Sequence, residues 1–160
     1  MTSSRAARTM VCTAVLCGVL IGPVSSASAS KASIKSAIVS YSSKIDVAEG
    51  GVLTAVGEYK AAPDPKDPAG VEAAISKSVA VLGALKTRVA RQSAAAPRVK
   101  SAKSKIQAGL QAVIVGYDEL SVAYGEIASQ PEAASSEATK AEVVVKKGRR
   151  QLSEGVKLLD

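Results

Sequence analysis

The chain has 160 residues, 21 basic and 14 acidic side chains, and a formal net charge of +7. It contains no His, Trp or Phe and four Tyr. Without His, neither a Ser-His-Asp triad nor a Cys-His pair can form, and a carboxylate-bridged di-iron bundle loses its Glu-x-x-His motif. We therefore expect one domain with a single core that is not an enzyme and holds no metal or other cofactor.

Residues 1–29 have the three parts of a secretory signal peptide. Arg5 and Arg8 form a short basic region, an apolar run extends from Val11 to Gly22, and the segment ends in Ala27-Ser28-Ala29. This order predicts cleavage after Ala29. The apolar run is shorter than the roughly 20 residues that a membrane span needs, so an uncleaved anchor is the less favoured alternative.

Both cysteines, Cys12 and Cys17, lie in this leader. Neither follows the small residue that lipid attachment requires, because Val11 and Leu16 precede them. Residues 30–160 therefore carry no thiol, and this excludes a disulfide and the usual N/S zinc site. Their net charge falls from +7 to +5 because two Arg leave with the leader. We expect a secreted protein, either extracellular or associated with the cell wall.

Three breaks divide the segment 30–160 into four parts. They are the proline-rich stretch 62–68, the junction 93–97 that ends in Pro97, and the junction 129–131 that ends in Pro131. Proline is excluded from helix interiors but fits the first position of a new helix. The breaks predict helices at about 31–61, 68–95, 97–129 and 131–159.

Within each part, apolar residues recur in alternating steps of three and four, as on one buried face of a helix. The third part shows this best, at Val99, Ala102, Ile106, Leu110, Val113, Tyr117, Leu120, Tyr124 and Ile127. The stripe of the second part has one polar interruption, at Ser78. No part alternates with period two. We predict an all-α, antiparallel up-down-up-down four-helix bundle; the alternative is two helical hairpins that separate or pair between molecules.

Many glycines lie inside the predicted helices, where each costs about 1 kcal/mol relative to alanine. One explanation is close approach of helix backbones in an Ala-rich bundle without aromatic fillers. The other is looseness that lets helices open, for which Gly50-Gly51 is the best hinge candidate.

The charges are unevenly distributed. No acid lies between Glu72 and Asp118, a stretch that holds eight bases. When the antiparallel bundle is divided at its middle, one end collects residues 30–45, 82–113 and 145–160, with 15 bases and two acids. The other end has 12 acids and four bases. Helix dipoles favour bases near helix C-termini, but the bases from Arg98 to Lys105 lie in N-terminal turns, so capping alone does not explain this end.

The basic end predicts a polyanion-binding surface. Its residues are Arg88, Arg91, Arg98, Lys100, Lys103, Lys105, Lys146, Lys147, Arg149 and Arg150. The partners we expect are anionic cell-envelope polymers, such as wall teichoic-type polymers and surface glycans, or anionic lipid headgroups. Head-to-tail pairing with the acidic end of a neighbouring molecule and an uneven solvated surface are the alternatives. Sequence-specific nucleic-acid binding is not expected, because no aromatic residue interleaves with the basic run to stack on bases.

A second hypothesis makes the apolar stripes the working surface, in a membrane-active bundle or one that binds a lipophilic ligand such as haem. Tyrosine can ligate haem iron, although all four tyrosines lie on apolar stripes where core packing is the usual role. A bundle can also open and insert amphipathic helices into a membrane. The absence of Trp and Phe, which usually anchor such helices at the interface, disfavours this mode.

The chain resembles the small exported helical proteins of high-GC Gram-positive bacteria. The resemblance rests on Ala-rich helices after a signal peptide, on the run KSKIQAGLQAV and on the ending KKGRRQLSEGVKLL, and it covers the second half of the chain better than the first. That group is uncharacterised, so the resemblance implies export but no activity and no site residues.

Overall fold

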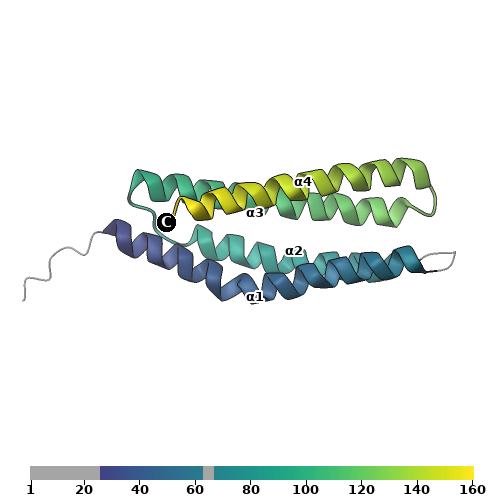
Figure 1. Ribbon diagram of the computed structural model, residues 1–160, viewed down its shortest axis with the longest axis horizontal. Coiled ribbons are helices and arrows are strands. Elements are labelled where there is room, and N and C mark those ends of the chain that lie inside the picture. The colour runs from purple at the N-terminus through teal and green to yellow at the C-terminus, as the bar shows by residue number, and fades with distance from the viewer. Residues whose placement is uncertain (1–25, 63–66) are drawn as a thin grey trace, which may run out of the picture.

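The computed structural model describes residues 26–62 and 67–160 and contains four helices within them. They are α1 (Ser26–Ala61), α2 (Ala69–Ala90), α3 (Pro97–Glu126) and α4 (Pro131–Lys157). The helices run alternately up and down along one rod, so the starts of α1 and α3 lie beside the ends of α2 and α4 (Figure 1). This arrangement confirms the predicted all-α antiparallel bundle.

The predicted leader falls mostly outside the described residues. Residues 1–25, which include its basic region, its apolar run and both cysteines, are not described. α1 begins at Ser26, ahead of the predicted cleavage point, so processing after Ala29 would remove the first turn of this helix. None of the helices in the described ranges is long and apolar enough to cross a membrane.

Proline sets the starts of α3 and α4. Pro97 and Pro131 occupy the first helical positions, where their missing N–H groups leave no bond unmade. The extended backbone of Ala96, at φ −75° and ψ 144°, is the conformation that a following proline imposes. α2 ends at Ala90, five residues before the predicted position 95. The ends of α3 and α4 lie two to three residues before the predicted positions 129 and 159.

The apolar stripes of the four helices meet in one core. Ile34, Leu85, Val89, Ile106 and Leu110 have no exposed surface, and partly buried side chains from every helix pack around the core. At the end where α1 meets α2, the rings of Tyr59 and Tyr124 pack edge to face, with centroids 5.1 Å apart. Ser78 interrupts the α2 stripe, is fully buried, and its hydroxyl has no hydrogen-bond partner.

All buried side chains of the described ranges lie between Ser30 and Leu159. The segment 30–160 therefore contains the whole core. It is the natural unit for experiments on the folded bundle.

α3 and α4 form the closest helix pair of the bundle, because small residues face one another every seven positions. The buried series are Ala102, Gly109, Gly116 and Ala123 on α3, and Ala134, Ala141, Gly148 and Gly155 on α4. A seven-residue repeat keeps its members on one side of a helix, so the two series form a continuous seam. We call these eight residues the small-residue seam.

The seam brings backbone against backbone. A Cβ added to Gly109 would lie 2.5 Å from the Leu152 amide nitrogen and 2.8 Å from the Gly148 carbonyl oxygen. A Cβ added to Gly148 would lie 2.7 Å from the Val113 amide nitrogen. Gly116 and Gly155 are hindered in the same way. Close approach of the helix backbones, one of the two explanations considered from the sequence, therefore accounts for these four glycines.

α1 is held differently. It packs mainly on α2, touches α3 at few positions, and does not approach α4 closely with its backbone. It also bends near its middle (Figure 1), in the part of the helix where the hydroxyls of Ser40 and Ser42 bond back to the carbonyls of Ala37 and Val39. Such bonds often bend helices. A Cβ at Gly50 or Gly51 would meet nothing within 4 Å, so packing within the chain does not require either glycine.

The seam predicts opposite effects of the same substitution at two glycines. Gly148→Ala places a methyl group against fixed backbone atoms, and overpacking of this kind costs typically about 2 kcal/mol of unfolding free energy. Gly57→Ala, at an exposed position in α1 with nothing within 4 Å, gains up to about 1 kcal/mol from helix propensity. Urea unfolding of residues 30–160 followed by circular dichroism measures both; equal effects would contradict the close approach.

Candidate functional site

The structure separates the ten predicted polyanion-binding residues into two groups. Arg88 lies in the last turn of α2, and Arg91 caps that helix. Arg98, Lys100, Lys103 and Lys105 lie in the first three turns of α3, so six bases gather at one end of the rod. The remaining four, Lys146, Lys147, Arg149 and Arg150, lie just beyond the middle of α4.

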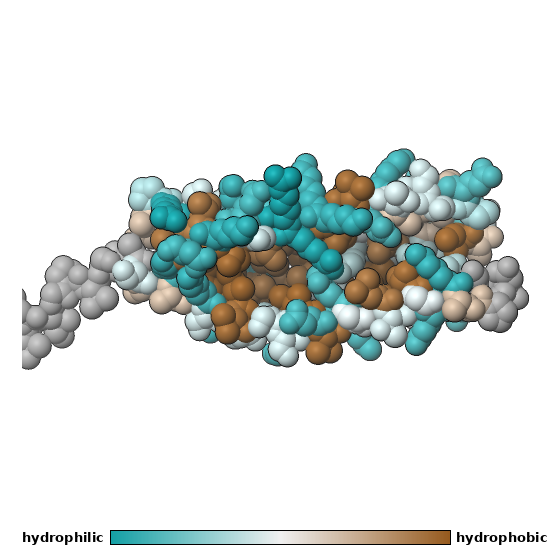
Figure 2. All heavy atoms as spheres, in the orientation of Figure 1, coloured by the Kyte–Doolittle hydropathy of each residue, from teal (hydrophilic) through white to brown (hydrophobic). Residues whose placement is uncertain are grey.

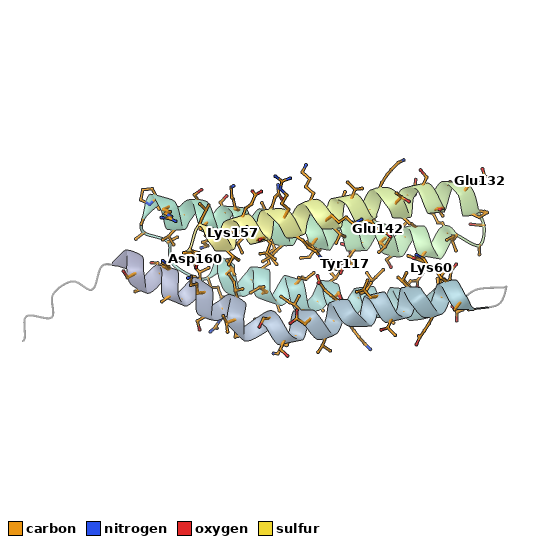
Figure 3. All side chains as sticks on the ribbon, in the orientation of Figure 1. Lys60, Tyr117, Glu132, Glu142, Lys157 and Asp160 are labelled. Atoms are coloured by element: carbon orange, nitrogen blue, oxygen red, sulfur yellow. The ribbon has the colours of Figure 1, made fainter. Side chains whose placement is uncertain are left out.

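The same end holds the last residues of the chain. Lys157 and Asp160 lie beside the first turns of α1, whereas Lys60 and Glu132 lie at the opposite end of the rod (Figure 3). In the half that contains Asp160, the other acid is Glu154, as the sequence division predicted.

Several bases at this end cap neighbouring helices. The Lys103 ammonium donates hydrogen bonds to the carbonyl oxygens of Ala90, at 2.7 Å, and Gln92, at 2.6 Å, and so satisfies the C-terminus of α2. Arg98 Nε donates to the Leu158 carbonyl at the end of α4, at 3.0 Å. Helix C-termini carry unsatisfied carbonyls and a partial negative charge. Bases in the N-terminal turns of α3 thus compensate the ends of its antiparallel neighbours.

Glu154 is shared by two bases. Lys105 Nζ lies 3.2 Å and Arg150 Nε 3.1 Å from its carboxylate oxygens. The hydrogen bonds from Lys105 and Arg150 lower the pKa of the Glu154 carboxyl below its ordinary value. These three groups are largely solvent-accessible, and such pairs contribute little to stability.

Asp160 joins the C-terminus to α1. Lys35 Nζ lies 2.6 Å from Asp160 Oδ1, and Lys31 Nζ donates to the Asp160 backbone carbonyl at 2.9 Å. The hydrogen bond and charge of Lys35 lower the pKa of the Asp160 carboxyl. These contacts connect α1 to the residues that follow α4.

Arg149 makes the second connection. Its guanidinium lies 3.0 Å from Glu49 Oε2 of α1 and donates a hydrogen bond to the Tyr117 hydroxyl of α3, also at 3.0 Å. Burial, followed by the nearby Glu49 carboxylate, raises the pKa of the Tyr117 hydroxyl. Arg149 therefore holds three helices together. The sequence did not predict this cluster, because the spacing of residues within one helix gives no information about a contact among three helices.

Five of the ten bases remain available. Arg88, Arg91, Lys100, Lys146 and Lys147 make no side-chain hydrogen bond or ion pair with the part of the chain that the structure describes. Four of the others, Arg98, Lys103, Lys105 and Arg149, bond to other helices, and Arg150 bonds to Glu154. The described ranges contain no cluster of His, Cys, Asp and Glu that could hold a metal ion.

Two apolar grooves flank α1. One, of about 190 Å³, lies between α1 and α4 over α3, with Val52, Leu53, Val56, Leu120 and Val145 in its lining and Lys146 and Arg149 at its rim. Apolar surface is visible between these helices in Figure 2. The other, of about 780 Å³, lies between α1 and α2 and is lined largely by small residues.

The tyrosines do not favour haem ligation. Burial raises the pKa of both Tyr117 and Tyr124, and this stabilises the neutral phenol over the phenolate that would bind iron. The Tyr117 hydroxyl is also engaged by Arg149.

Comparison of the chain with models of protein families, with curated proteins and with solved structures gives no match.

The Asp160 connection predicts a pH-dependent loosening of α1. Because the folded pKa of Asp160 is lowered, its contribution is present above about pH 4 and is lost as the pH falls through the folded pKa. Asp160→Asn should lower amide hydrogen-exchange protection in the first three turns of α1 at pH 7, and the difference from wild type should shrink as the pH falls below about 4 and the wild-type carboxyl is protonated. The control is Glu137→Gln, which removes an exposed acid on α4. It should leave the hydrogen-exchange protection of α1 unchanged at pH 7 and at low pH.

Proposed function

We propose that the protein is a secreted, non-enzymatic binding protein of the cell envelope that attaches through its basic end to an anionic polymer or surface. One observation carries the proposal: the antiparallel topology brings bases from all four helices to one end, where the two acids are both already paired. Export is supported by the leader pattern of residues 1–29.

The available bases define where attachment occurs. Arg88 and Arg91 project from the end of α2, and Lys100 projects from the first turn of α3. These three side chains surround the α2–α3 junction, which is exposed at Arg91, Ser93 and Ala95. A polymer lying across this end would meet cations that have no competing partner within the described bundle. Lys146 and Lys147 extend the same charge along α4.

The capping bases have a different role in this proposal. Lys103 and Arg98 use hydrogen bonds to hold helix ends, so their removal would perturb the fold as well as the surface. The sequence-based set of ten residues is therefore divided into a binding group of five and a structural group of five. Only the binding group gives a clean test.

Attachment of this kind is electrostatic and must weaken with salt. Exposed charges are screened over about 8 Å at physiological ionic strength, so each base acts on the phosphate or carboxylate nearest to it. No aromatic residue lies among the bases from Arg88 to Lys105, so this run gives no platform for base stacking, which favours anionic polymers and headgroups over nucleic acid.

We predict that Arg91→Glu with Lys100→Glu abolishes most of the binding. A base near an anionic lipid surface contributes about 1 kcal/mol, so loss of two weakens binding roughly thirtyfold before repulsion is counted. The measurement is co-sedimentation of residues 30–160 with purified cell envelope and, separately, with anionic vesicles, across a series of salt concentrations.

The matched control is Lys77→Glu with Lys140→Glu, which changes the net charge by the same amount in the acidic half of the rod. Its binding should stay within a few-fold of wild type. Binding of the wild type to neither material, or equal losses in both variants, would contradict attachment through the basic end. Binding to envelope but not to vesicles would identify a polymer as the partner.

The groove between α1 and α4 favours a second candidate function, binding of a small lipophilic ligand. The groove exposes an apolar lining from three helices, and α1 is joined to α4 mainly through the Arg149 and Asp160 connections. A ligand could therefore enter by displacing α1 at modest cost. Surface attachment alone requires no such uptake.

For this candidate we predict fluorescence enhancement of an apolar dye by the wild-type segment and its loss in Leu53→Glu. Leu53 lines the groove and is 72% exposed, so the substitution leaves the core intact. Val122→Glu, on the outer side of α3, is the control. No dye uptake by the wild type, or equal uptake by all three proteins, would exclude the groove as a ligand site.

A further inference from the structure

The outer face of α1 is unusually apolar for a helix in contact with water. Among the described residues, its Val39, Val47 and Leu53 are the most exposed large hydrophobic side chains, at 72%, 74% and 72%. The intervening exposed positions carry mostly Ser, Thr and Gly rather than charge. A helix with apolar residues on both its inner and outer faces is normally covered on both.

This pattern does not suit a membrane surface. A helix that lies in a lipid interface has one apolar face and an opposite, strongly charged face, usually with Trp or Phe at the boundary. In α1 the apolar residues are spread around the helix, and the chain has neither aromatic type. The face is better suited to another protein surface.

The adjoining groove extends the face onto α2. Val47 and Gly51 of α1 line it together with Gly70, Ala73 and Val81 of α2. A Cβ at Gly51 or Gly70 would meet nothing within 4 Å, so the hollow is not used by packing within the chain. The groove can therefore accommodate side chains of another molecule.

The charges on this side of the rod identify a partner. α2 runs antiparallel to α1, and the hydroxyls of Ser30 and Ser93 lie 3.3 Å apart, so the exposed Arg91 lies beside the first turns of α1. At the opposite end, Glu58 and Asp67 are exposed. One side of the molecule is thus basic at one end and acidic at the other, and its middle is largely apolar apart from Lys44, Asp46 and Lys77. A second copy turned by 180° presents the complementary pattern.

We propose that two copies of the chain pair side by side and antiparallel through the outer face of α1 and the α1–α2 groove. The pair is isologous, with the two-fold axis passing near Val47, which lies within about one turn of the middle of α1. Arg88 and Arg91 of one copy then lie near Glu58 and Asp67 of the other. The interface thus includes Arg88 and Arg91 of the binding group, whereas Lys100, Lys146 and Lys147 lie outside it.

The available surface is large enough. α1 has 36 residues, and at about 1.5 Å per residue and about 10 Å in width its outer face, with the groove, approaches the roughly 800 Å² per partner of a standard stable interface. The valines and the small residues between them supply the apolar centre, and the charged ends form the rim.

The antiparallel pairing can be tested at three exposed positions that are spaced by seven residues along one side of α1. These positions are Ser40, Val47 and Thr54. With the axis at Val47, Val47 faces its own counterpart, and Ser40 of one copy faces Thr54 of the other. Residues 30–160 have no Cys, so each introduced thiol is the sole one. Val47→Cys should cross-link with itself under mild oxidation, whereas Ser40→Cys and Thr54→Cys should cross-link in a mixture but not separately.

Sedimentation equilibrium of the wild type should give twice the monomer mass at micromolar concentration, and Val47→Asp, which places like charges at the axis, should give the monomer. Circular dichroism should be unchanged in Val47→Asp, and salt-dependent binding to envelope should be retained, because the monomer keeps all five bases of the binding group. Retained binding distinguishes failure of the interface from failure of the attachment proposal. A monomeric wild type would overturn the proposal. So would self-cross-linking of Ser40→Cys alone, which indicates a parallel pair, or mass growth without cross-links, which indicates head-to-tail association.

Discussion

The direct backbone contact between α3 and α4 determines most of this structure. Eight small residues, four on each helix, allow the two helices to touch along their whole length. The contact leaves little space for large side chains, and Ile106 of α3 lies directly against Gly155 of α4. Other large apolar residues of α3, such as Leu110 and Leu120, belong to the common core. α2 covers that core from one side. α1 completes the bundle with less contact than any other helix.

The antiparallel topology also gives the basic end two functions. A helix C-terminus presents carbonyl groups, and its antiparallel neighbour presents an N-terminus at the same level. Bases in the first turns of α3 reach the ends of α2 and α4, as Lys103 and Arg98 do, and bases in the first turns of α1 reach Asp160. Their unfavourable position relative to their own helix dipole is offset by these hydrogen bonds. The five bases of the binding group make no such contact, so helix packing does not explain why they are basic.

The sequence allowed the fold to be predicted because proline breaks and a three-four apolar period are local signals, and a cationic excess at one end follows once the topology is antiparallel. The small-residue seam was also visible, as a seven-residue repeat from Ala102 to Ala123 and from Ala134 to Gly155, but the glycines were interpreted without it. The link from Arg149 to Glu49 and Tyr117 could not be predicted, because it depends on the rotation of three helices. The division of the ten bases into the binding group and the structural group depends in the same way on how the helices are positioned relative to one another.

The uneven distribution of contacts has a consequence for the order of folding. The tightest pair is formed by the last two helices, which are joined by a short connection and therefore collapse quickly once both are available. The first helix packs mainly on the second, and this looser pair is completed only when α3 packs against it. A nascent chain thus cannot complete its core until almost all of it has been synthesised.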